Sequence, residues 1–126
     1  MPKTILIVDD YPEFAQLLEE RLKTEGYRIE TAFDGSAGIE KAKALKPDLI
    51  LLDIMMPQVG GTEVRAELMK EPGTRGIPII FLTGLRAPQA NRKTPIYHDL
   101  KVIGKSRDFK ELLEAIQETL KNSPEL

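Results

Sequence analysis

Short apolar runs alternate with longer amphipathic stretches along this chain of 126 residues. Unbroken apolar runs occupy residues 5–8, 49–52 and 79–82, and polar or turn-forming residues bound each of them. Apolar runs of this length are typical of strands in a parallel sheet that helices cover on both faces. Weaker patterns predict two more strands, at residues 28–31 and 101–103.

The stretches between these runs have the periodicity of helices. Apolar residues recur at positions i, i+3, i+4 and i+8 after the first run, at Phe14, Leu17, Leu18 and Leu22. Pro12 suits the first turn of this helix, and Gly26 suits its end. A similar spacing predicts a last helix over residues 109–120, with Ser106 or Asp108 as its cap.

Two further helices are expected at residues 36–45 and 62–69. Residues 86–99 have the least regular pattern, because Pro88 suits a helix start but Pro95 would end that helix early. With a helix counted there, five strands alternate with five helices in a single domain that spans residues 1–126. This alternation predicts a doubly wound α/β fold of the flavodoxin-like kind, with a five-stranded parallel sheet in the strand order 2-1-3-4-5.

Composition and charge narrow the functional classes. The charges nearly balance, with 18 Lys and Arg against 20 Asp and Glu, whereas a dedicated nucleic-acid-binding protein usually has a large basic excess. The chain has no cysteine, which excludes a disulfide framework and a thiolate metal site. It has no apolar run of about 18 residues that would span a membrane, and no secretory signal pattern. We therefore expect a cytoplasmic protein that binds neither nucleic acid nor membranes directly.

Three carboxylates follow predicted strands. Asp9 and Asp10 end the first strand, and Asp53 ends the third. In the expected strand order these two strands are neighbours, so the three acids converge at one edge of the sheet. Two like unit charges about 4 Å apart repel by about 4 kcal/mol at an effective dielectric constant near 20. A divalent cation with oxygen ligands relieves this repulsion, and we therefore predict a Mg²⁺ site.

Two more polar side chains follow later strands. Thr83 comes directly after residues 79–82 and offers a hydroxyl, and Lys105 comes after the fifth strand and offers an ammonium. A metal ion, a hydroxyl and an ammonium around one carboxylate form a suitable environment for a phosphoryl group. Phosphoryl transfer depends mainly on such positioning and charge stabilisation, so these strand-end residues predict phosphoryl chemistry.

At these residues the chain resembles a known family, the receiver domains of bacterial response regulators, and in particular the stand-alone chemotaxis and sporulation types. The similar motifs are ILIVDD at 5–10, DLILLDIMMP at 48–57, IPIIFLTG at 77–84, and Lys105. The resemblance covers essentially the whole chain, and the ordered set is far more specific than any single motif. It implies a phosphorylation-dependent switch of a two-component system, which accepts a phosphoryl group from a sensor histidine kinase or a phosphotransfer protein.

The resemblance also implies the role of each acid. Asp53 is expected to be the phosphoacceptor, which forms an acyl phosphate. Asp10 is expected to bind Mg²⁺ directly, and Asp9 to act mostly through water. Asp53 and the backbone carbonyl of Met55 are expected to complete the metal ligands that the protein supplies.

The remaining matching residues are expected to contact the phosphoryl group or to shape the site. By the same resemblance, Thr83 would donate a hydrogen bond to one phosphoryl oxygen, and Lys105 would pair with another. Pro57 and Gly61 would shape the loop beside the acceptor. The chain is not expected to be an enzyme, beyond accepting the phosphoryl group and losing it again by autodephosphorylation.

Some positions depart from the pattern of the family. Ile103 stands where many receivers have an aromatic residue that moves when the threonine engages phosphate, and Ser106 replaces the usual proline after the lysine. Gly60 replaces a commonly acidic residue, and the segment 94–101 does not match the usual stretch before the fifth strand. We therefore expect the chemistry to be retained and the signalling face around residues 86–104 to have diverged.

Three other functions fit parts of the pattern. A Mg²⁺-dependent phosphatase of the haloacid-dehalogenase type expects a second aspartate two residues after its nucleophile, where Tyr11 and Pro12 stand after Asp9 and Asp10. A flavodoxin-like FMN-binding protein needs a phosphate loop rich in Ser, Thr and Gly after the first strand, where this chain has DDYPEF. A degenerate receiver that only binds partners is the third alternative.

The chain is expected to pass on its signal through a further protein or domain. The last predicted helix runs nearly to Leu126, which leaves no room for an output domain after it. Either the chain acts through a partner protein, or it is a piece of a larger protein. We expect a monomer or a weak dimer.

Overall fold

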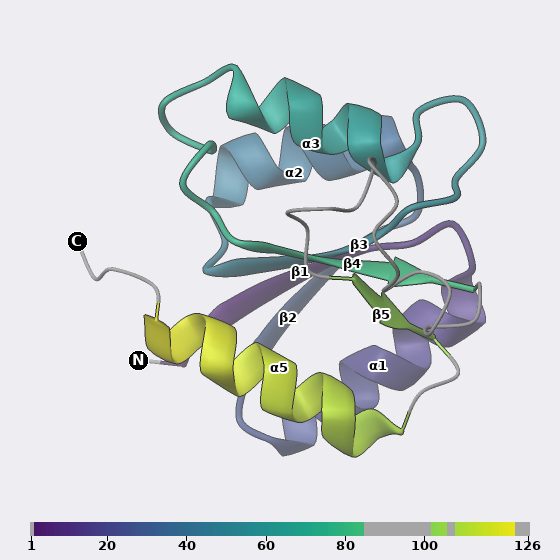
Figure 1. The fold of residues 1–126 in the computed structure, drawn as a ribbon, viewed down its shortest axis with the longest axis vertical. Helices are drawn as coiled ribbons and strands as arrows, with labels where there is room; N and C mark the ends of the chain where they lie inside the picture. Colours follow the sequence, from purple (N-terminus) through teal and green to yellow (C-terminus); the bar gives the residue numbers. More distant parts are fainter. Residues whose placement is uncertain (1, 85–101, 106–107, 123–126) are drawn as a thin grey trace.

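The structure, a computed structural model, describes residues 2–84, 102–105 and 108–122 (Figure 1). In these residues the chain forms five strands and four helices, which are β1 Thr4–Val8, α1 Pro12–Thr24, β2 Arg28–Ala32, α2 Gly35–Leu45, β3 Leu49–Asp53, α3 Gly61–Met69, β4 Ile79–Thr83, β5 Val102–Gly104 and α5 Phe109–Asn122. The observed ends differ by at most two residues from those that the sequence predicted. The helix expected within residues 86–99 lies outside the described residues, as do Lys101 and the proposed cap Ser106.

All five strands are parallel and form one sheet in the order β2-β1-β3-β4-β5, which confirms the predicted order. The register pairs Val8 of β1 with Leu52 of β3, so these two strands end at the same level. In the same way Thr83 of β4 lies beside Gly104 of β5. The polar residues at the carboxyl ends of four neighbouring strands therefore meet at one edge of the sheet.

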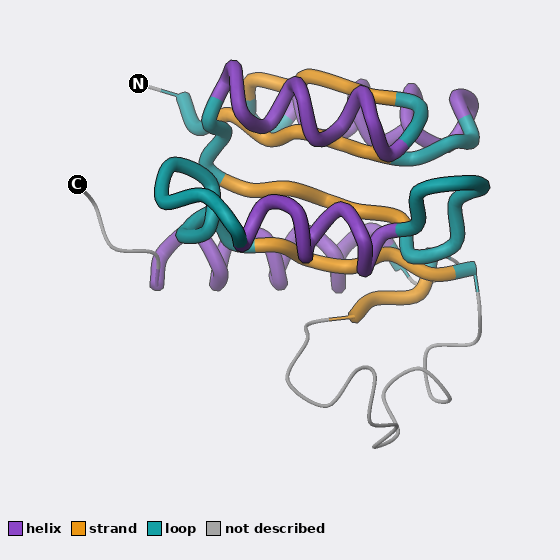
Figure 2. Tube along the Cα trace, turned by 90° about the horizontal axis from the view of Figure 1, so that it is seen from above, coloured by secondary structure: helices purple, strands orange, loops and turns teal. Residues whose placement is uncertain are grey.

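Helices cover both faces of the sheet. Figure 1 shows α2 and α3 on one face and α1 and α5 on the other, and Figure 2 shows the helices running roughly along the strands. Alternate residues of each strand enter two separate apolar cores. The core under α2 and α3 includes Leu6, Val8, Ile50, Leu52 and Phe81. The core under α1 and α5 includes Ile5, Ile7, Leu49, Leu51, Ile80 and Leu82. Because both faces are buried, the strands read as unbroken apolar runs.

Local sequence sets the ends of the helices that frame the site. Pro12 starts α1 two residues after Asp10, and its fixed φ suits the first turn. Beyond the end of α1, Gly26 has a φ of 96°, which only glycine adopts at little cost. At the start of α2, Asp34 Oδ1 accepts a hydrogen bond from Ala37 N at 2.8 Å. Within the described part of the chain, no helix is long and apolar enough to cross a membrane.

Helix α2 packs so closely on β1 that it requires glycine at position 38. A Cβ there would lie 2.7 Å from Cγ1 and 2.9 Å from Cγ2 of Val8. We predict that Gly38→Ala lowers the free energy of unfolding by about 1 kcal/mol, because the cost of overpacking exceeds the gain in helix propensity. Urea unfolding measures this change. Gly76→Ala is the control, because its Cβ would meet no atom within 4 Å. Equal stability of the two variants would contradict the close packing.

Candidate functional site

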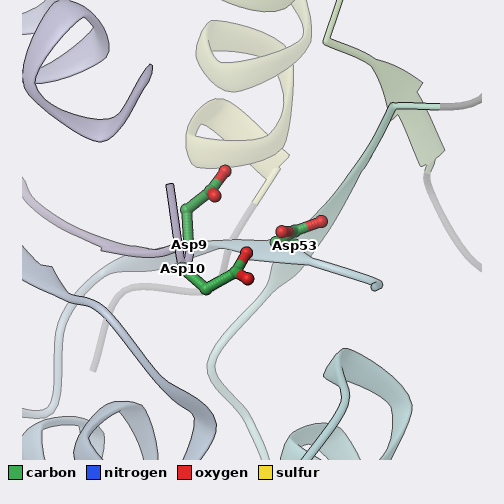
Figure 3. Close-up of side chains that lie close together, drawn as sticks. All are labelled: Asp9, Asp10 and Asp53. Carbon is green, nitrogen blue, oxygen red and sulfur yellow. The ribbon is translucent and has the colours of Figure 1, made fainter. Parts of the chain in front are cut away.

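Three carboxylates meet beyond the carboxyl ends of β1 and β3. Asp9 and Asp10 follow β1, and Asp53 is the last residue of β3. Each contributes one oxygen to a group whose atoms all lie within 4.8 Å of one another. Figure 3 shows that Asp9 and Asp10 leave the chain in opposite directions, and that Asp10 is turned toward Asp53. The structure thus brings together the three acids that the sequence predicted.

Two of these carboxylates are buried. Asp9 is 0% and Asp53 2% exposed, whereas Asp10 is exposed. The backbone N–H of Tyr11 donates to Asp9 Oδ1 at 2.9 Å, and that of Met55 donates to Asp53 Oδ1 at 3.3 Å. Each buried carboxylate is therefore oriented by its own loop through Oδ1, and its Oδ2 faces other partners.

Lys105 supplies positive charge to the buried pair. Its Nζ lies 2.9 Å from Asp9 Oδ2 and 3.3 Å from Asp53 Oδ2. Its backbone N–H donates to the carbonyl oxygen of Thr83 at 2.7 Å, which ties the end of β5 to the end of β4. Burial lowers the pKa of Lys105, but the hydrogen bonds and negative charges of Asp9 and Asp53 outweigh it, so the pKa lies above its ordinary value. The ammonium is therefore charged at neutral pH.

One ammonium does not fully compensate the charges around Asp53. Burial is the largest cause that raises the pKa of Asp53, to about 7, and the negative charge of Asp9 is the second. Lys105 opposes both through its charge and its hydrogen bond, while a hydrogen bond with Asp10 raises the pKa further. Asp53 is thus a carboxyl group that binds a proton unusually tightly in the absence of a metal ion.

Thr83 completes the set of strand-end residues. It is the last residue of β4 and is fully buried. In the sheet register it lies beside Gly104, one residue before Lys105, and β4 is the neighbour of the strand that carries Asp53. Thr83 and Lys105 thus lie at the same edge of the sheet as the acids.

Two glycines allow the loop between β3 and α3 to pack closely against its neighbours, the end of β3 and helix α2. A Cβ on Gly61 would lie 2.4 Å from the carbonyl oxygen of Asp53, which gives the predicted loop-shaping role of this glycine a steric basis. A Cβ on Gly35 of α2 would lie 2.5 Å from the carbonyl oxygen of Val59 in the loop. Gln58 has a φ of 67°, a conformation that non-glycine residues rarely adopt. Sequence reasoning missed the contributions of Gly35 and Gln58.

Three contacts of the Lys105 ammonium were also missed. The sequence assigned this lysine to a phosphoryl oxygen, whereas here it forms ion pairs with both buried carboxylates. Its Nζ also lies 5.0 Å from the centre of the Phe14 ring. Spacing shows which residues end strands or share a helix face, but not where a long flexible side chain points.

The donor set fits a magnesium ion. Asp9, Asp10 and Asp53 offer oxygen ligands, and together they carry three negative charges when ionised, against one positive charge on Lys105. Asp9 Oδ2 is buried and, apart from its ion pair with Lys105, has no hydrogen-bond partner among the described residues. Mg²⁺ prefers carboxylate and water oxygens and commonly takes one or two carboxylates. The acid cluster therefore has both the ligand type and the surplus charge that this ion requires.

The fold and site together define a class of α/β protein with a cluster of acids and a lysine at the carboxyl edge of a five-stranded parallel sheet. The profile of the response regulator receiver domain matches residues 5–117 of the chain. The chain therefore belongs to the response regulator receiver domain family, as its motifs indicated.

Similar proteins include regulators and solved receiver structures. Response regulator ArlR of Staphylococcus aureus (strain Mu50) is 34% identical over 121 residues, which are 96% of this chain and 54% of the relative. The probable transcriptional regulatory protein TcrX of Mycobacterium tuberculosis is 40% identical over 82 residues, 65% of this chain and 34% of the relative. The structure of response regulator protein TrrA from Thermotoga maritima in complex with Mg(2+)-BeF is 36% identical with a TM-score of 0.78, covering 93% of this chain and 98% of that one. The chain thus spans about a third to a half of these two curated relatives.

The raised pKa of Asp53 makes the stability of the metal-free protein depend on pH. Its pKa is about 7 in the folded protein and near 3.8 without these surroundings, so the folded state binds this proton more tightly. The resulting contribution to the free energy of unfolding is fully present below about pH 4 and is lost as the pH rises through about 7. Asp53→Asn removes this loss. We predict that the free energy of unfolding of the Asp53→Asn protein, relative to that of the unsubstituted protein, increases by on the order of 1–2 kcal/mol between pH 5 and pH 8.

Urea unfolding in EDTA across this pH range measures the difference. Asp34→Asn, which changes another acid at the same edge and keeps a good helix cap, should follow the unsubstituted protein at every pH. Saturating Mg²⁺ should shrink the effect, because it favours the ionised carboxylate. A difference that stays flat, or falls with rising pH, would show that burial does not control the charge of Asp53.

Magnesium should stabilise the fold by mass action, because the acid cluster exists only in the folded chain. We predict that millimolar Mg²⁺ raises the melting temperature, and that Asp10→Ala reduces this response. Asp10→Ala also removes surplus negative charge, so its metal-free melting temperature should rise by about 2–5 °C. Thermal unfolding with Mg²⁺ and with EDTA measures both effects, and Glu13→Ala should keep the full Mg²⁺ response. If Mg²⁺ shifts neither the unsubstituted protein nor the control, the metal-site interpretation is wrong.

Proposed function

We propose that this chain is a phosphorylation-dependent switch of a two-component system, and that Asp53 is its phosphoacceptor. The observation that carries the proposal is the arrangement around Asp53, a buried carboxylate with two further acids within 4.8 Å and Lys105 Nζ at 3.3 Å. Such a set offsets the charge of a phosphoryl group and keeps an oxygen nucleophile in place. The proposed donor is the phosphohistidine of a sensor histidine kinase or of a phosphotransfer protein.

In the proposed reaction, an oxygen of ionised Asp53 attacks the phosphorus atom of the donor. The new O–P bond forms as the bond between phosphorus and the histidine nitrogen of the donor breaks. That nitrogen keeps the bonding electron pair, and the neutral imidazole leaves with a proton on its other nitrogen. The product is the acyl phosphate of Asp53, which water later cleaves to the carboxylate and inorganic phosphate.

We assign the metal ligands to the acid cluster. Asp10 and Asp53 hold Mg²⁺ directly, Asp9 acts through water, and the carbonyl oxygen of Met55 is a further ligand. When bound, the ion supplies positive charge next to the phosphoryl oxygens. The Mg(2+)-BeF complex of the Thermotoga maritima relative supports a site that holds Mg²⁺ together with a phosphoryl group, because beryllofluoride mimics that group.

Lys105 and Thr83 serve the transferred group directly. Nζ of Lys105 passes from the carboxylate of Asp53 to an oxygen of the phosphoryl group, a change that keeps its charge paired throughout. The hydroxyl of Thr83 donates to a second phosphoryl oxygen. The burial of Thr83, at the end of the strand next to β3, supports this role.

Two observations disfavour the alternative functions. A receiver that only binds partners does not need the unfavourable cluster of acids around Asp53, which Lys105 Nζ at 3.3 Å compensates only in part. A phosphatase of the haloacid-dehalogenase type needs an acid two residues after the nucleophile, where this chain has the exposed Met55. Binding of nucleic acid forms no part of the proposal, since the charges of the chain nearly balance. We propose output through a protein partner in the cytoplasm, with the chain as a monomer or a weak dimer.

The proposal is tested with small phosphoryl donors, which need no docking to a kinase. We predict that acetyl phosphate or phosphoramidate adds one phosphoryl group per chain in the presence of Mg²⁺, measured as intact mass. Asp53→Asn should abolish the addition, because the nucleophile is lost, and EDTA should prevent it. Asp34→Asn should be labelled normally, as it lies at the same edge outside the acid cluster. Undiminished labelling of Asp53→Asn would refute the assignment of the acceptor.

A further inference from the structure

Phe14 lies next to the ammonium of the site. Its ring, in the first turn of α1, has Nζ of Lys105 at 5.0 Å from its centroid. The same Nζ lies 2.9 Å from Asp9 Oδ2 and 3.3 Å from Asp53 Oδ2. We infer that Phe14 is a positioning residue, whose ring holds the Lys105 ammonium at the two carboxylates where the phosphoryl group arrives. This inference rests on the proposed function of Asp53.

The backbone by itself positions Lys105 only weakly. It follows β5, which has three residues, Val102–Gly104, and which lies at the edge of the described sheet. A lysine ammonium sits on a flexible four-carbon stem with many rotamers. An aromatic face within about 6 Å attracts the cation and so favours the rotamers that place it there. A ring contact therefore adds a constraint that the short strand does not supply.

Phe14 is itself fixed relative to the acids. Helix α1 starts at Pro12, two residues after Asp10, so the ring and the acid pair belong to one short loop–helix segment. The ring packs against the apolar core between the sheet and helices α1 and α5. A cation held on this ring therefore keeps a defined distance from Asp9.

A cavity beside the Phe14 ring could accommodate the Lys105 side chain in another rotamer. It has a volume of about 170 Å³, lies between α1 and α5, and is lined by Phe14, Lys105, Leu82, Phe109 and other residues. A lysine stem that rotated away from the carboxylates would enter this space. The Phe14 ring limits that rotation, and a shorter side chain would enlarge the space and weaken the limit.

Phe109 is a matched control in the same cavity. Its ring is also half-buried, and it too has a cation 5.0 Å from its centroid, the guanidinium carbon of Arg21. Both ring–cation pairs join the α1 side of the cavity to the α5 side, but Arg21 is not part of the acid site. Loss of either ring removes similar packing, and only loss of Phe14 releases Lys105.

The first test compares rates of labelling by phosphoramidate at saturating Mg²⁺. Phe14→Leu should lower the maximal rate by about three- to thirty-fold, the range expected for loss of a cation–π contact. The donor concentration at half-maximal rate should change little, because the lysine acts on the reacting group. Phe14→Tyr keeps an aromatic face and should stay within about two-fold of the unsubstituted rate, as should Phe109→Leu.

The second test is a double-mutant cycle with Lys105→Met. If Phe14 acts through Lys105, Phe14→Leu should cause no further loss of rate once the ammonium is gone. The same four proteins are compared by urea unfolding, which needs no phosphorylation. There the shifts in midpoint caused by Phe14→Leu and Lys105→Met should be non-additive. Two further proteins, Phe109→Leu and its double variant with Lys105→Met, complete a control cycle, whose coupling should be smaller because the Phe109 ring holds Arg21 and not Lys105.

The outcomes separate this inference from the proposed function. One contrary outcome is that Phe14→Leu lowers the labelling rate of the Lys105→Met protein by the same factor as it lowers that of the unsubstituted protein. Another is that Phe109→Leu lowers the labelling rate as much as Phe14→Leu does. Either outcome would show that the Phe14 ring acts through packing alone, and the inference would be wrong. A normally labelled Phe14→Leu protein overturns the inference and leaves Asp53 as the acceptor. Absence of labelling at Asp53 in the unsubstituted protein refutes the proposed function, and the positioning role with it.

Discussion

Asp9 and Asp53 are buried at the ends of two neighbouring strands, where the negative charge of Asp9 disfavours the ionised form of Asp53. Lys105 compensates part of this charge through ion pairs at 2.9 Å and 3.3 Å. Desolvation makes the remainder costly, which is why Asp53 holds its proton up to a pH of about 7. The site can lower its energy by binding a proton or a cation, and the chemistry that we propose follows from that excess of negative charge.

The rest of the fold prevents the acids from relieving their repulsion by moving apart. The two strands are hydrogen-bonded neighbours, and helices pack on both faces of the sheet. The packing behind the site is close, since Gly38 lies against Val8 and Gly61 lies against the carbonyl of Asp53. Close-packed interiors deform little, so the charge must be neutralised where it stands. Because the close-packed fold keeps the acids together, their repulsion favours the binding of a cation.

Lys105 connects this charge balance to the edge of the sheet. Its side chain contacts the acids of β1 and β3, and its backbone is hydrogen-bonded to the end of β4. Lys105 directly follows β5, the short strand that carries the half-buried Ile103. The Phe14 ring restricts how far the ammonium can move. In this receiver domain, the side chain to which we assign a phosphoryl contact is also the one that compensates the buried acids.

The sequence alone determined the strands, their order and the residues at their ends, because burial on both faces leaves unbroken apolar runs and parallel strands end at one edge. It also indicated the family, since the acids, Thr83 and Lys105 occur in a specific order along the chain. Only the tertiary structure decided the partners of Lys105, the contact with Phe14 and the packing of Gly35 on Val59. These contacts join residues far apart in the chain, and they depend on side-chain direction and on the distance between packed helices. Periodicity and spacing carry no information about either.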